Sequence, residues 1–473
     1  MCIRDRGYIN AHKAYARGAT GEGEVVAVID ESLHLENDEF DGNNKIVAAS
    51  LAWTHPGPGY YTTRGRHQRF SDHGTAVASI AVGARGGTSV SNQVQGVAYK
   101  AKLAFFDHTK LGGRFVITDG GHRVFPEKFL NDHGAAIVNI SYGLSGDIDK
   151  YWEKNSSPAT NKKKNRRERE QQRRDEKLQD LRIMASQLAQ TDTDDADKII
   201  YVWAAGNSHS KNSVSPWAGM GVYFPELRGH VLAVTGVDKA GKYSSGGYNK
   251  CGSAKDFCLA APGVDVWAAV MEKKDPKLIH PHHDVFASEE VKTGVRPFGG
   301  TSAAAPQVSG ALAVMRQYFS VDHADGTRTY QLGNTELVAR LLKTANKTGK
   351  FADSDRYGQG LLDLDAATAP VGALATSLST DPNAQPFNPA AFSLSGNAFG
   401  GAMRDALGGV KIAAFDELDA PFFFPLADGV SHAPQISAGH SDTLHEHEVA
   451  LGGVSSNASL ALSLAAGELS AAR

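Results

Sequence analysis

The chain has 473 residues, of which 41% are hydrophobic, enough to form the core of one large domain or of up to about three smaller ones. Its net charge of −3 at pH 7 implies no overall positive field that would draw it to nucleic acid or to a membrane surface. Its apolar runs are shorter than the roughly 18 residues that a membrane-spanning helix needs, so no transmembrane helix is predicted.

The first predicted strand ends on a carboxylate. Residues 7–24 indicate a helix and a turn, and Val25 to Ile29 then form a short β-branched apolar run typical of a buried parallel strand. Asp30 follows at the carboxyl end of this strand. Open α/β sheets bind ligands and place catalytic groups at that end of their strands, so Asp30 is a candidate functional residue.

A histidine opens the first predicted helix of the core. Residues 53–70 carry aromatic residues and prolines and predict a surface loop. After it, Ser71 or Asp72 could cap a helix that buries Val77 and Ile80, which places His73 in the first turn.

Further strands alternate with helical patterns, which predicts an α/β fold with a parallel sheet between helices. An amide follows one of them, because Asn207 lies just past the end of the run Ile199 to Trp203. Such an amide can stabilise an oxygen that gains negative charge during a reaction. The other strand candidates are Lys102–Phe106, Ala136–Ile140 and Val231–Val234.

A charged segment, residues 155–197, interrupts this alternation. Asn161 to Lys177 is dense in Lys and Arg with Glu between them, and apolar residues then recur at helical spacing before the acidic run Asp192 to Asp197. The segment could be a patch for nucleic acid or membranes. We favour a long solvated helix inserted before the Asn207 strand, because acidic residues break the positive field. The apolar positions are Leu178, Leu181, Met184 and Leu188.

Cysteines and histidines give weaker signals. Cys251 and Cys258, separated by six residues, fit either a small disulfide loop or two unrelated buried thiols, and Cys2 is the third cysteine. His280, His282 and His283 have a spacing that could bind a metal, but no acidic or cysteine partner is near in sequence. We therefore expect a polar loop there and assign no metal ligands.

The run from Gly299 to Pro306 completes a catalytic set. Ser302 follows two glycines and begins a small-residue helical pattern, so it is expected at a helix N-terminus. A serine is a poor nucleophile unless a base takes its proton and a third group orients that base. Ser302 would attack, His73 would act as base, Asp30 would orient His73, and Asn207 would stabilise the oxyanion together with the Ser302 N–H.

These segments together resemble the subtilisin (subtilase) family of serine endopeptidases over about residues 18–370. The resemblance implies the Asp30-His73-Ser302 triad, the oxyanion donor Asn207, and an acyl-enzyme mechanism. It implies that a polypeptide substrate pairs as an added strand with Ser141-Tyr142-Gly143, and that Ala204-Ala205-Gly206 walls the specificity pocket. The matching segments are Val26–Asp30, His73–Ala78, Gly96–Ala98, Asn139–Gly143, Ala204–Asn207, Ala260–Gly263 and Gly300–Gly310.

A narrower resemblance concerns subtilases that are carried as autotransporter passengers. It rests on Cys251 to Gly263 and on Tyr357 to Asp363, and with the cysteine spacing it favours a Cys251–Cys258 disulfide. It implies export from a Gram-negative bacterium and display or release outside the cell. A maturation protease that acts on its own chain or on neighbouring surface proteins is a further possibility. We therefore expect that the signal peptide and the membrane barrel lie outside this sequence.

Several positions depart from the family pattern. Glu31 and Ser32 follow Asp30 where the family has Ser or Thr and then Gly, and an inward-pointing Glu31 would raise the pKa of His73. Ala303 replaces a larger residue, and Gln307 replaces a histidine. No cofactor is required by the predicted chemistry. Structural calcium is common in the family, with Glu39 and Asp41 as candidates, but no full ligand set can be matched.

We therefore predict a lead-in at residues 1–24 and a catalytic domain at 25–370 that contains the 155–197 insertion. A connector at 371–473, rich in Ala, Ser, Gly and Leu, would form a small irregular or β extension. The predicted activity is peptide-bond hydrolysis by a secreted or surface-displayed enzyme. The alternative is a catalytically inactive adhesin or binding module with the same fold, which Glu31 motivates.

Overall fold

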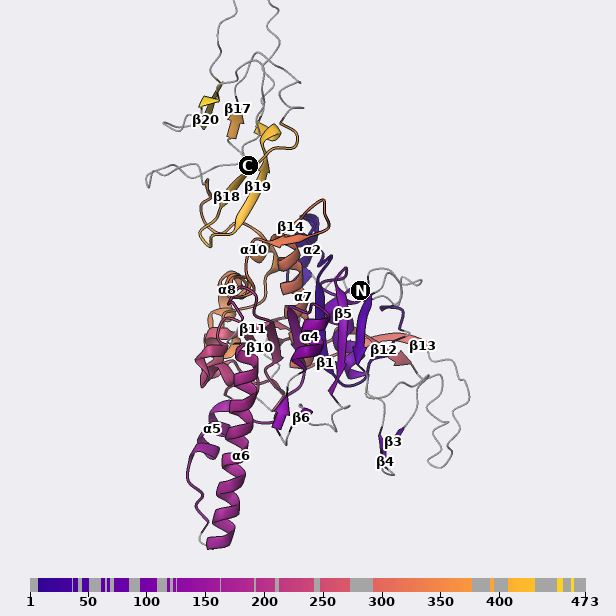
Figure 1. Ribbon diagram of the computed structural model, residues 1–473, viewed down its shortest axis with the longest axis vertical. Helices are drawn as coiled ribbons and strands as arrows, with labels where there is room; N and C mark the ends of the chain where they lie inside the picture. Colours follow the sequence, from indigo (N-terminus) through magenta and orange to yellow (C-terminus); the bar gives the residue numbers. More distant parts are fainter. Residues whose placement is uncertain are drawn as a thin grey trace, which may run out of the picture. The chain divides into compact units, whose positions relative to one another are not determined.

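The computed structural model places two compact units, residues 1–368 and 369–473, and each is described by itself (Figure 1). The residues that it describes are 7–35, 37–40, 45–50, 61–63, 66–68, 72–84, 94–108, 117–119, 122–124, 126–161, 163–190, 193–208, 212–241, 247–272, 292–376, 392–394, 407–429, 449–453 and 461–462.

The first unit is built on a parallel sheet of seven strands in the order β11-β10-β9-β8-β1-β5-β2. Each neighbouring pair in this order is parallel, which confirms the predicted α/β fold. The strands are β1 (Val25–Asp30), β2 (Ile46–Ser50), β5 (Lys102–Asp107), β8 (Ile137–Ile140), β9 (Ile200–Ala204), β10 (Val231–Val237) and β11 (Cys258–Pro262).

The central strands are apolar because both faces of the sheet are covered. β8, β9, β10 and β11 are buried at every residue, which matches the unbroken apolar runs in the sequence. Successive side chains alternate between the faces. On β8, Val138 and Ile140 belong to one core cluster, whereas Asn139 between them bonds to Ser309 of helix α7 on the opposite face.

Helices α3 (His73–Val82) and α7 (Thr301–Tyr318) cover that second face and contact each other. Both are rich in small residues, which lets their backbones approach closely. A Cβ at Gly310 would lie 2.7 Å from Cβ of Val97 and 2.8 Å from the Ala81 carbonyl oxygen, so a larger residue would push the two helices apart. Tight packing here fixes the start of each helix relative to the sheet.

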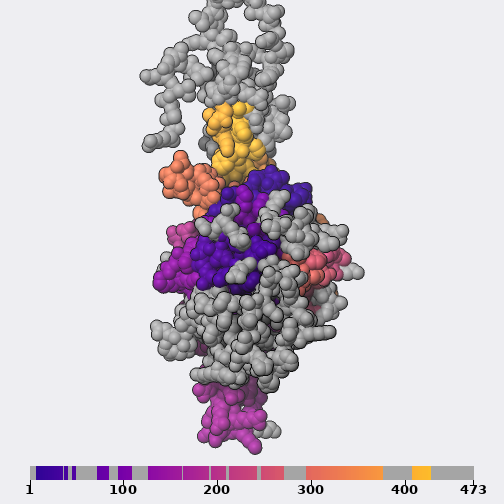
Figure 2. Space-filling model, turned by 90° about the vertical axis from the view of Figure 1, so that its right-hand side faces the viewer, coloured from indigo at the N-terminus to yellow at the C-terminus, as the bar shows by residue number. Residues whose placement is uncertain are grey.

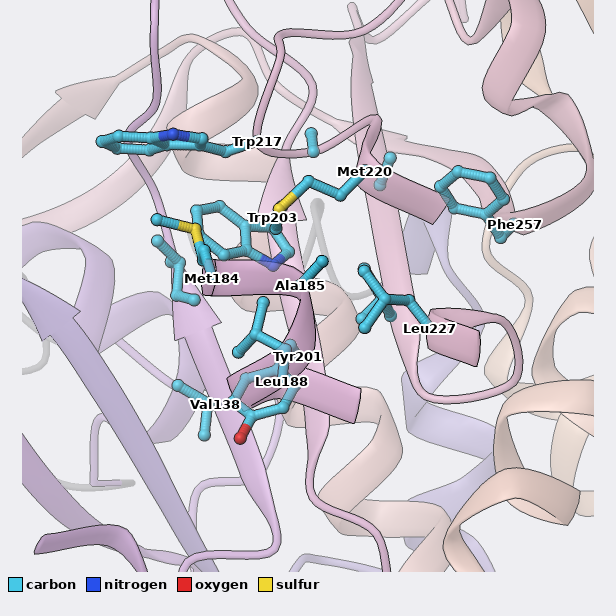
Figure 3. Close-up of a cluster of buried hydrophobic side chains, with 14 of the residues drawn as sticks. Val138, Met184, Ala185, Leu188, Tyr201, Trp203, Trp217, Met220, Leu227 and Phe257 are labelled. Atoms are coloured by element: carbon cyan, nitrogen blue, oxygen red, sulfur yellow. The ribbon is translucent and has the colours of Figure 1, made fainter. Parts of the chain in front are cut away.

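The first face is covered by α4 (Glu127–Asp132), α5 (Ile148–Ser156) and α6 (Lys164–Ala189). Figure 3 shows Met184, Ala185 and Leu188 of α6 packed on Tyr201 and Trp203 of β9. Sequence reasoning expected an inserted solvated helix at this point. The helix is present, but one side of its C-terminal half packs in the core, whereas its N-terminal half has no buried residue.

Hairpins and short helices complete the first unit. The antiparallel pairs are β3 (Tyr61–Thr63) with β4 (Arg66–Gln68), β6 (Ile117–Asp119) with β7 (His122–Val124), β12 (Val266–Glu272) with β13 (Lys292–Phe298), and β14 (Ser320–Asp322) with β15 (Arg328–Tyr330). The helices are α2 (Ala11–Ala16), α8 (Asn334–Thr344), α9 (Ser354–Tyr357) and α10 (Leu364–Thr368), with 3-10 turns η2 (Met220–Val222), η3 (Pro225–Leu227), η4 (Gly252–Phe257) and η6 (Gly349–Ala352).

A disulfide joins Cys251 and Cys258 across η4, so the cysteines are paired rather than separate thiols. Gly358 lies against this bridge, because a Cβ there would meet the Cys258 carbonyl oxygen at 2.0 Å. Its φ of 61° also favours glycine. The bridge thus fixes the start of β11 next to the segment that follows α9.

The second unit contains two small antiparallel sheets, in accord with the predicted β extension. One has the order β16-β18-β19 and the other the order β17-β20-β21. The strands are β16 (Ala375–Thr376), β17 (Phe392–Leu394), β18 (Lys411–Phe415), β19 (Pro421–Pro425), β20 (Val449–Gly453) and β21 (Ala461–Leu462), and η7 (Leu426–Gly429) follows β19. Of the helices described in the chain, none is both long and apolar enough to cross a bilayer.

Candidate active site

The candidate catalytic residues meet at one edge of the sheet because parallel strands end together there. Ile29 of β1 pairs with Ile140 of β8, which pairs with Trp203 of β9. Asp30 and Ser141 therefore lie at one level, at the carboxyl ends of their strands, and Asn207 follows the end of β9. Helices α3 and α7 begin at the same edge, with His73 and Ser302 in their first turns.

Asp30 and His73 form a direct hydrogen bond, with 2.7 Å between Oδ1 of Asp30 and Nδ1 of His73. Asp30 is 1% exposed, and the same Oδ1 accepts the Glu31 N–H at 2.7 Å. The carboxylate accepts from the imidazole, so Nδ1 carries a proton and Nε2 of a neutral ring can accept another. The edge of the ring packs against Phe298 at 5.3 Å between centroids.

The pKa of His73 is raised above its ordinary value of 6.5. Burial of the ring lowers the pKa, but attraction to Asp30, the hydrogen bond that the ring donates to Asp30 and the charge of Glu31 together outweigh that effect. Glu31 therefore acts in the direction expected from the sequence. A raised pKa makes His73 a stronger base once it is neutral.

Ser302 is held by a reciprocal pair of hydrogen bonds with Ser141. Its Oγ donates to the Ser141 carbonyl oxygen at 2.9 Å, and Oγ of Ser141 donates to the Ser302 carbonyl oxygen at 3.1 Å. Ser302 is 6% exposed. The nucleophile candidate is thus tied to the backbone acceptor at the end of β8.

A chain of buried polar groups supports this pair from behind. Oγ of Ser309 donates to Oδ1 of Asn139 at 3.0 Å, and Nδ2 of Asn139 donates to Oγ of Ser141 at 2.9 Å. Asn139 and Ser309 are both 0% exposed. Because every bond in the series is desolvated, the positions of Ser141 and Ser302 are strongly constrained.

Asn207 has an oriented side-chain amide. Its Oδ1 accepts two hydrogen bonds from Thr301, one from the backbone N–H at 3.0 Å and one from Oγ1 at 3.1 Å. Two donors to one atom identify that atom as the oxygen, so Nδ2 is the remaining donor. Asn207 is exposed, which leaves Nδ2 within reach of a substrate oxygen next to Ser302.

The loop before Ser302 has a backbone that only glycine adopts readily. Gly300 has a φ of 102°, and a Cβ there would lie 3.1 Å from Nδ2 of Asn207. Its N–H donates to the Gly263 carbonyl oxygen at 2.8 Å and to the Tyr248 hydroxyl at 3.0 Å. Gly300 thus turns the chain into α7 without obstructing the Asn207 amide.

The two predicted substrate-binding segments both contact the start of α7, because Ser141 bonds to Ser302 and the Gly206 N–H donates to Oγ1 of Thr301 at 3.1 Å. Ser141, Tyr142 and Gly143 continue from the end of β8, and Tyr142 stacks on His108 at 4.1 Å and lies edge-on to Trp217 at 5.9 Å between centroids. Ala204 and Ala205 are almost fully buried, whereas Gly206 is partly exposed. Of these alanines and the glycine, Gly206 is the residue whose surface a substrate can reach.

Ser32, one of the two residues after Asp30 that depart from the family pattern, has an unusual backbone conformation. Ser32 has a φ of 59°, a left-handed conformation that costs an L-amino acid energy and that the family's usual glycine adopts freely.

Of the two residues predicted to cap helix α3, Ser71 lies outside the described residues. Asp72 is the N-cap of α3 without a side-chain capping bond, and its Oδ2 lies 3.4 Å from Nη2 of Arg296.

The residues present do not make up a metal site in the described part of the chain. Glu39 is buried, and its Oε1 accepts the Val94 N–H at 2.6 Å. Burial raises the pKa of Glu39 to about 8 and lowers the pKa of the neighbouring Lys45 to about 7. Asp41, His280, His282 and His283 lie outside the described residues, and within these no group of three His, Cys, Asp or Glu could hold a metal ion.

Sequence reasoning missed residues that act through tertiary contacts. Thr301 orients Asn207, Ser309 supports Asn139, and Tyr248 bonds both Gly300 and the Gly263 carbonyl oxygen. Thr301 and Ser309 belong to the motif around Ser302, so the motif itself could have drawn attention to these two positions. For Tyr248 the sequence gives no such signal, because its partners are 15 and 52 residues away.

Comparison with known proteins identifies the family of the chain. A sequence profile of the Subtilase family matches residues 21–360. An "Extracellular serine protease" of Serratia marcescens is 27% identical over 388 residues, covering 76% of this chain and 33% of that protein. "Serotype-specific antigen 1" of Mannheimia haemolytica is 32% identical over 170 residues, covering 36% of this chain and 15% of that protein.

Among solved structures, a mutant of the protease domain of PatA has a TM-score of 0.44 and 20% identity, covering 74% of this chain and 95% of that one. The chain spans no more than about a third of the length of the curated relatives it matches. The family match itself covers most of this sequence and every candidate catalytic residue. The chain therefore belongs to the subtilase family of serine peptidases.

Proposed function

We propose that this chain is a secreted serine endopeptidase that hydrolyses peptide bonds of extended polypeptides through an acyl-enzyme on Ser302. The hydrogen bond between Asp30 and His73 is the observation that carries the proposal, since it presents Nε2 of a basic imidazole at the edge where Ser302 lies in the first turn of α7. Asn207, with Oδ1 held by Thr301, supplies an oriented donor for the oxyanion.

The first step releases the Ser302 hydroxyl from the Ser141 carbonyl. An extended substrate that adds as a strand along Ser141 to Gly143 would direct its own backbone N–H at that carbonyl. The hydroxyl then donates to His73 instead. Binding of the substrate and activation of the nucleophile are thereby coupled, because both use the same acceptor.

The chemical steps balance without a cofactor. Oγ of Ser302 bonds to the substrate carbonyl carbon while its proton passes to Nε2 of His73, and the carbonyl oxygen takes the negative charge beside Asn207. The C–N bond then breaks, and His73 gives its proton to the leaving amine. Water next gives a proton to His73 while its oxygen bonds to the acyl carbon. The bond between Oγ of Ser302 and that carbon then breaks, His73 returns its proton to Oγ, and the acid is released.

Three observations support an extracellular enzyme of the autotransporter passenger type. The first is that the Serratia relative is an extracellular serine protease. The second is the Cys251–Cys258 disulfide, because disulfides persist in oxidising compartments. The resemblance of Cys251 to Gly263 to passenger subtilases adds the Gram-negative export route. Substrates would then be polypeptides outside the cell, including other copies of the chain and neighbouring surface proteins.

The test is hydrolysis of an unstructured polypeptide by the purified chain, followed by mass spectrometry of the fragments. We expect internal cleavage that is lost in Ser302→Ala and kept in Ser186→Ala, an exposed serine of α6. Cleavage of the Ser302→Ala protein by the unaltered chain would reveal self-processing in trans.

A second candidate is an inactive binding module with the same fold. The bond of the Ser302 hydroxyl to Ser141 favours it, because in that arrangement the proton is directed away from a catalytic base. Equal absence of cleavage by the unaltered chain and by Ser302→Ala, with both proteins folded, would support this candidate over the endopeptidase.

A further inference from the structure

Helix α6 extends past the edge of the sheet at which the catalytic residues lie. Its Leu188 end is near the amino ends of the strands, since the Leu188 carbonyl oxygen contacts Nε2 of His230 at 2.9 Å just before β10. Met184, one turn earlier, lies beside Trp203 near the carboxyl end of β9 (Figure 3). Earlier residues of α6 therefore lead toward and beyond the catalytic edge.

The lengths of these elements show how far the helix extends. The 26 residues of α6 span about 39 Å, whereas the five residues of β9 span about 17 Å. The buried positions of α6 begin only at Leu178. Residues 164–177 thus form a projecting segment about 21 Å long, called here the α6 arm, which Figure 1 shows leading away from the sheet. Its surface is the magenta region at the foot of Figure 2.

The arm is braced along α5 and is not a frayed end. The Ala159 N–H donates to Oε1 of Gln171 at 2.8 Å, and Nη1 of Arg174 donates to the Ser157 carbonyl oxygen at 2.9 Å. Arg174 also pairs with Glu170. Side chains on such a support are presented at fixed spacing.

The arm carries a net positive charge, although the whole chain has a net charge of −3. Residues 164–177 contain seven Lys and Arg against four Asp and Glu, and the acidic residues Asp175 and Glu176 lie at the end of the arm next to the core. Arg166, Arg169 and Arg173 are exposed, and none of them forms an ion pair with a carboxylate among the described residues. With Lys163 they line an open hollow of about 950 Å³.

We propose that the α6 arm is a cationic exosite that recruits polypeptide substrates through an acidic segment outside the bond to be cut. The proposal rests on the proposed endopeptidase function and narrows its substrate class. Arg166, Arg169 and Arg173 recur at spacings of three and four residues, so they share one side of the helix. Guanidinium groups bind carboxylates in a bidentate manner, which suits an acidic peptide lying along that side.

An acidic polypeptide fits the arm better than nucleic acid does. The arm projects from the edge where the polypeptide substrate is bound, so both parts of one chain can be held at once. Glu168 and Glu170 interrupt the basic run, and the negative charge of the rest of the chain opposes binding of a long polyanion. A short acidic segment avoids most of that repulsion.

The experiment compares two fluorogenic peptides with the same cleavable core. One carries a tail of six Glu after a flexible Gly/Ser linker of about ten residues, long enough to span the arm, and the other carries six Gln. Each is tested with the unaltered chain, with Arg166→Gln/Arg169→Gln/Arg173→Gln, and with the control Lys102→Gln/Arg182→Gln/Lys343→Gln. The control removes three exposed positive charges elsewhere on the same unit.

At low ionic strength we expect the Glu tail to raise kcat/KM about tenfold for the unaltered chain and for the control, through several exposed ion pairs and faster association. The arm variant should lose that advantage and treat the Gln-tailed peptide normally. Addition of 0.5 M NaCl should remove the advantage from every protein, because salt screens exposed charges.

Equal rates on both tails with the unaltered chain would overturn the proposal, and so would an equal loss on both tails in the arm variant. Binding of a DNA duplex that depends on the arm, without any effect of the Glu tail, would replace it with a nucleic-acid site. If neither peptide is cut, the endopeptidase proposal fails separately. Anisotropy of the labelled Glu tail with the two triple variants then decides whether the arm binds acidic peptide.

Discussion

At the scale of single residues, the site depends on the charge around one imidazole. In the proposed mechanism His73 accepts the Ser302 proton only when the imidazole is neutral, and its raised pKa keeps it protonated to a higher pH than an ordinary histidine. Activity should therefore fall as the pH decreases through this raised pKa. Glu31 contributes to the shift, and it stands where the family has a small polar residue.

Replacement of Glu31 by Gln should move the acid limb of the kcat/KM profile to lower pH. The substitution removes a negative charge that favours the imidazolium, so the pKa of His73 falls and the base is neutral over a wider range. Profiles of the unaltered chain, Glu31→Gln and the distant control Glu22→Gln measure this. A limb that stays in place in Glu31→Gln would show that Glu31 does not act on His73.

Replacement of Asn207 by Ala should lower kcat about 100- to 1,000-fold with little change in KM, as loss of the corresponding amide does in subtilisin. The reason is that Nδ2 of Asn207, oriented by Thr301, interacts with charge that develops only in the transition state. Steady-state kinetics with Asn131→Ala as the control check it. A change in KM alone would assign Asn207 to substrate binding.

Ser32 is a site of stored backbone strain beside the catalytic carboxylate. Ser32→Gly should raise the free energy of unfolding by about 0.5–1 kcal/mol, because glycine adopts a φ of 59° without the steric cost. Ser186→Gly, inside α6, should lower it by about 0.5 kcal/mol. Denaturant unfolding measures the free energy of unfolding of each variant, which should rise in Ser32→Gly and fall in Ser186→Gly. A lower free energy of unfolding in Ser32→Gly would contradict the account.

At the scale of elements, the sequence predicts the strands and the motif helices well. Val26 to Ile29 are buried on both faces of the sheet, as the unbroken apolar run before Asp30 predicts. For α6, local composition does not predict in the same way that one half of the helix packs in the core and the other half projects into solvent. The spacing of Leu178, Leu181 and Leu188 indicates a helix face, but periodicity does not tell which surface that face covers.

Leu188→Ala should lower the free energy of unfolding by about 2–5 kcal/mol, because Leu188 is 0% exposed within the main core cluster. Arg167→Ala, in the exposed arm of the same helix, should change it by less than about 0.5 kcal/mol. Thermal or denaturant unfolding measures both. Similar small effects would mean that α6 is an appended helix after all.

The residues that support the site through tertiary contacts were not predictable from the sequence either. Asp30, His73, Ser302 and Asn207 are candidates from the sequence because each lies in a short, distinctive segment. Thr301 and Tyr248 become relevant only once Asn207 and Gly300 are brought beside them. Such roles depend on contacts between segments, and a single sequence carries no record of those contacts.

At the scale of the whole molecule, every candidate catalytic residue lies in the first compact unit. A chain shortened to residues 1–370 should therefore fold and keep its peptidase activity on a short peptide within about a factor of two to three. Circular dichroism and kcat/KM of the shortened and full chains check this. A folded but inactive shortened chain would assign the second unit a part in catalysis.

The most direct test of the central claim is the site of reaction with a fluorophosphonate, mapped by mass spectrometry of the digested protein. The Asp30–His73 pair should activate one hydroxyl, so we predict a single adduct on Ser302 that is lost in Ser302→Ala and strongly reduced in His73→Ala. The absence of any adduct on the folded chain, or an adduct that persists in Ser302→Ala, would contradict the account.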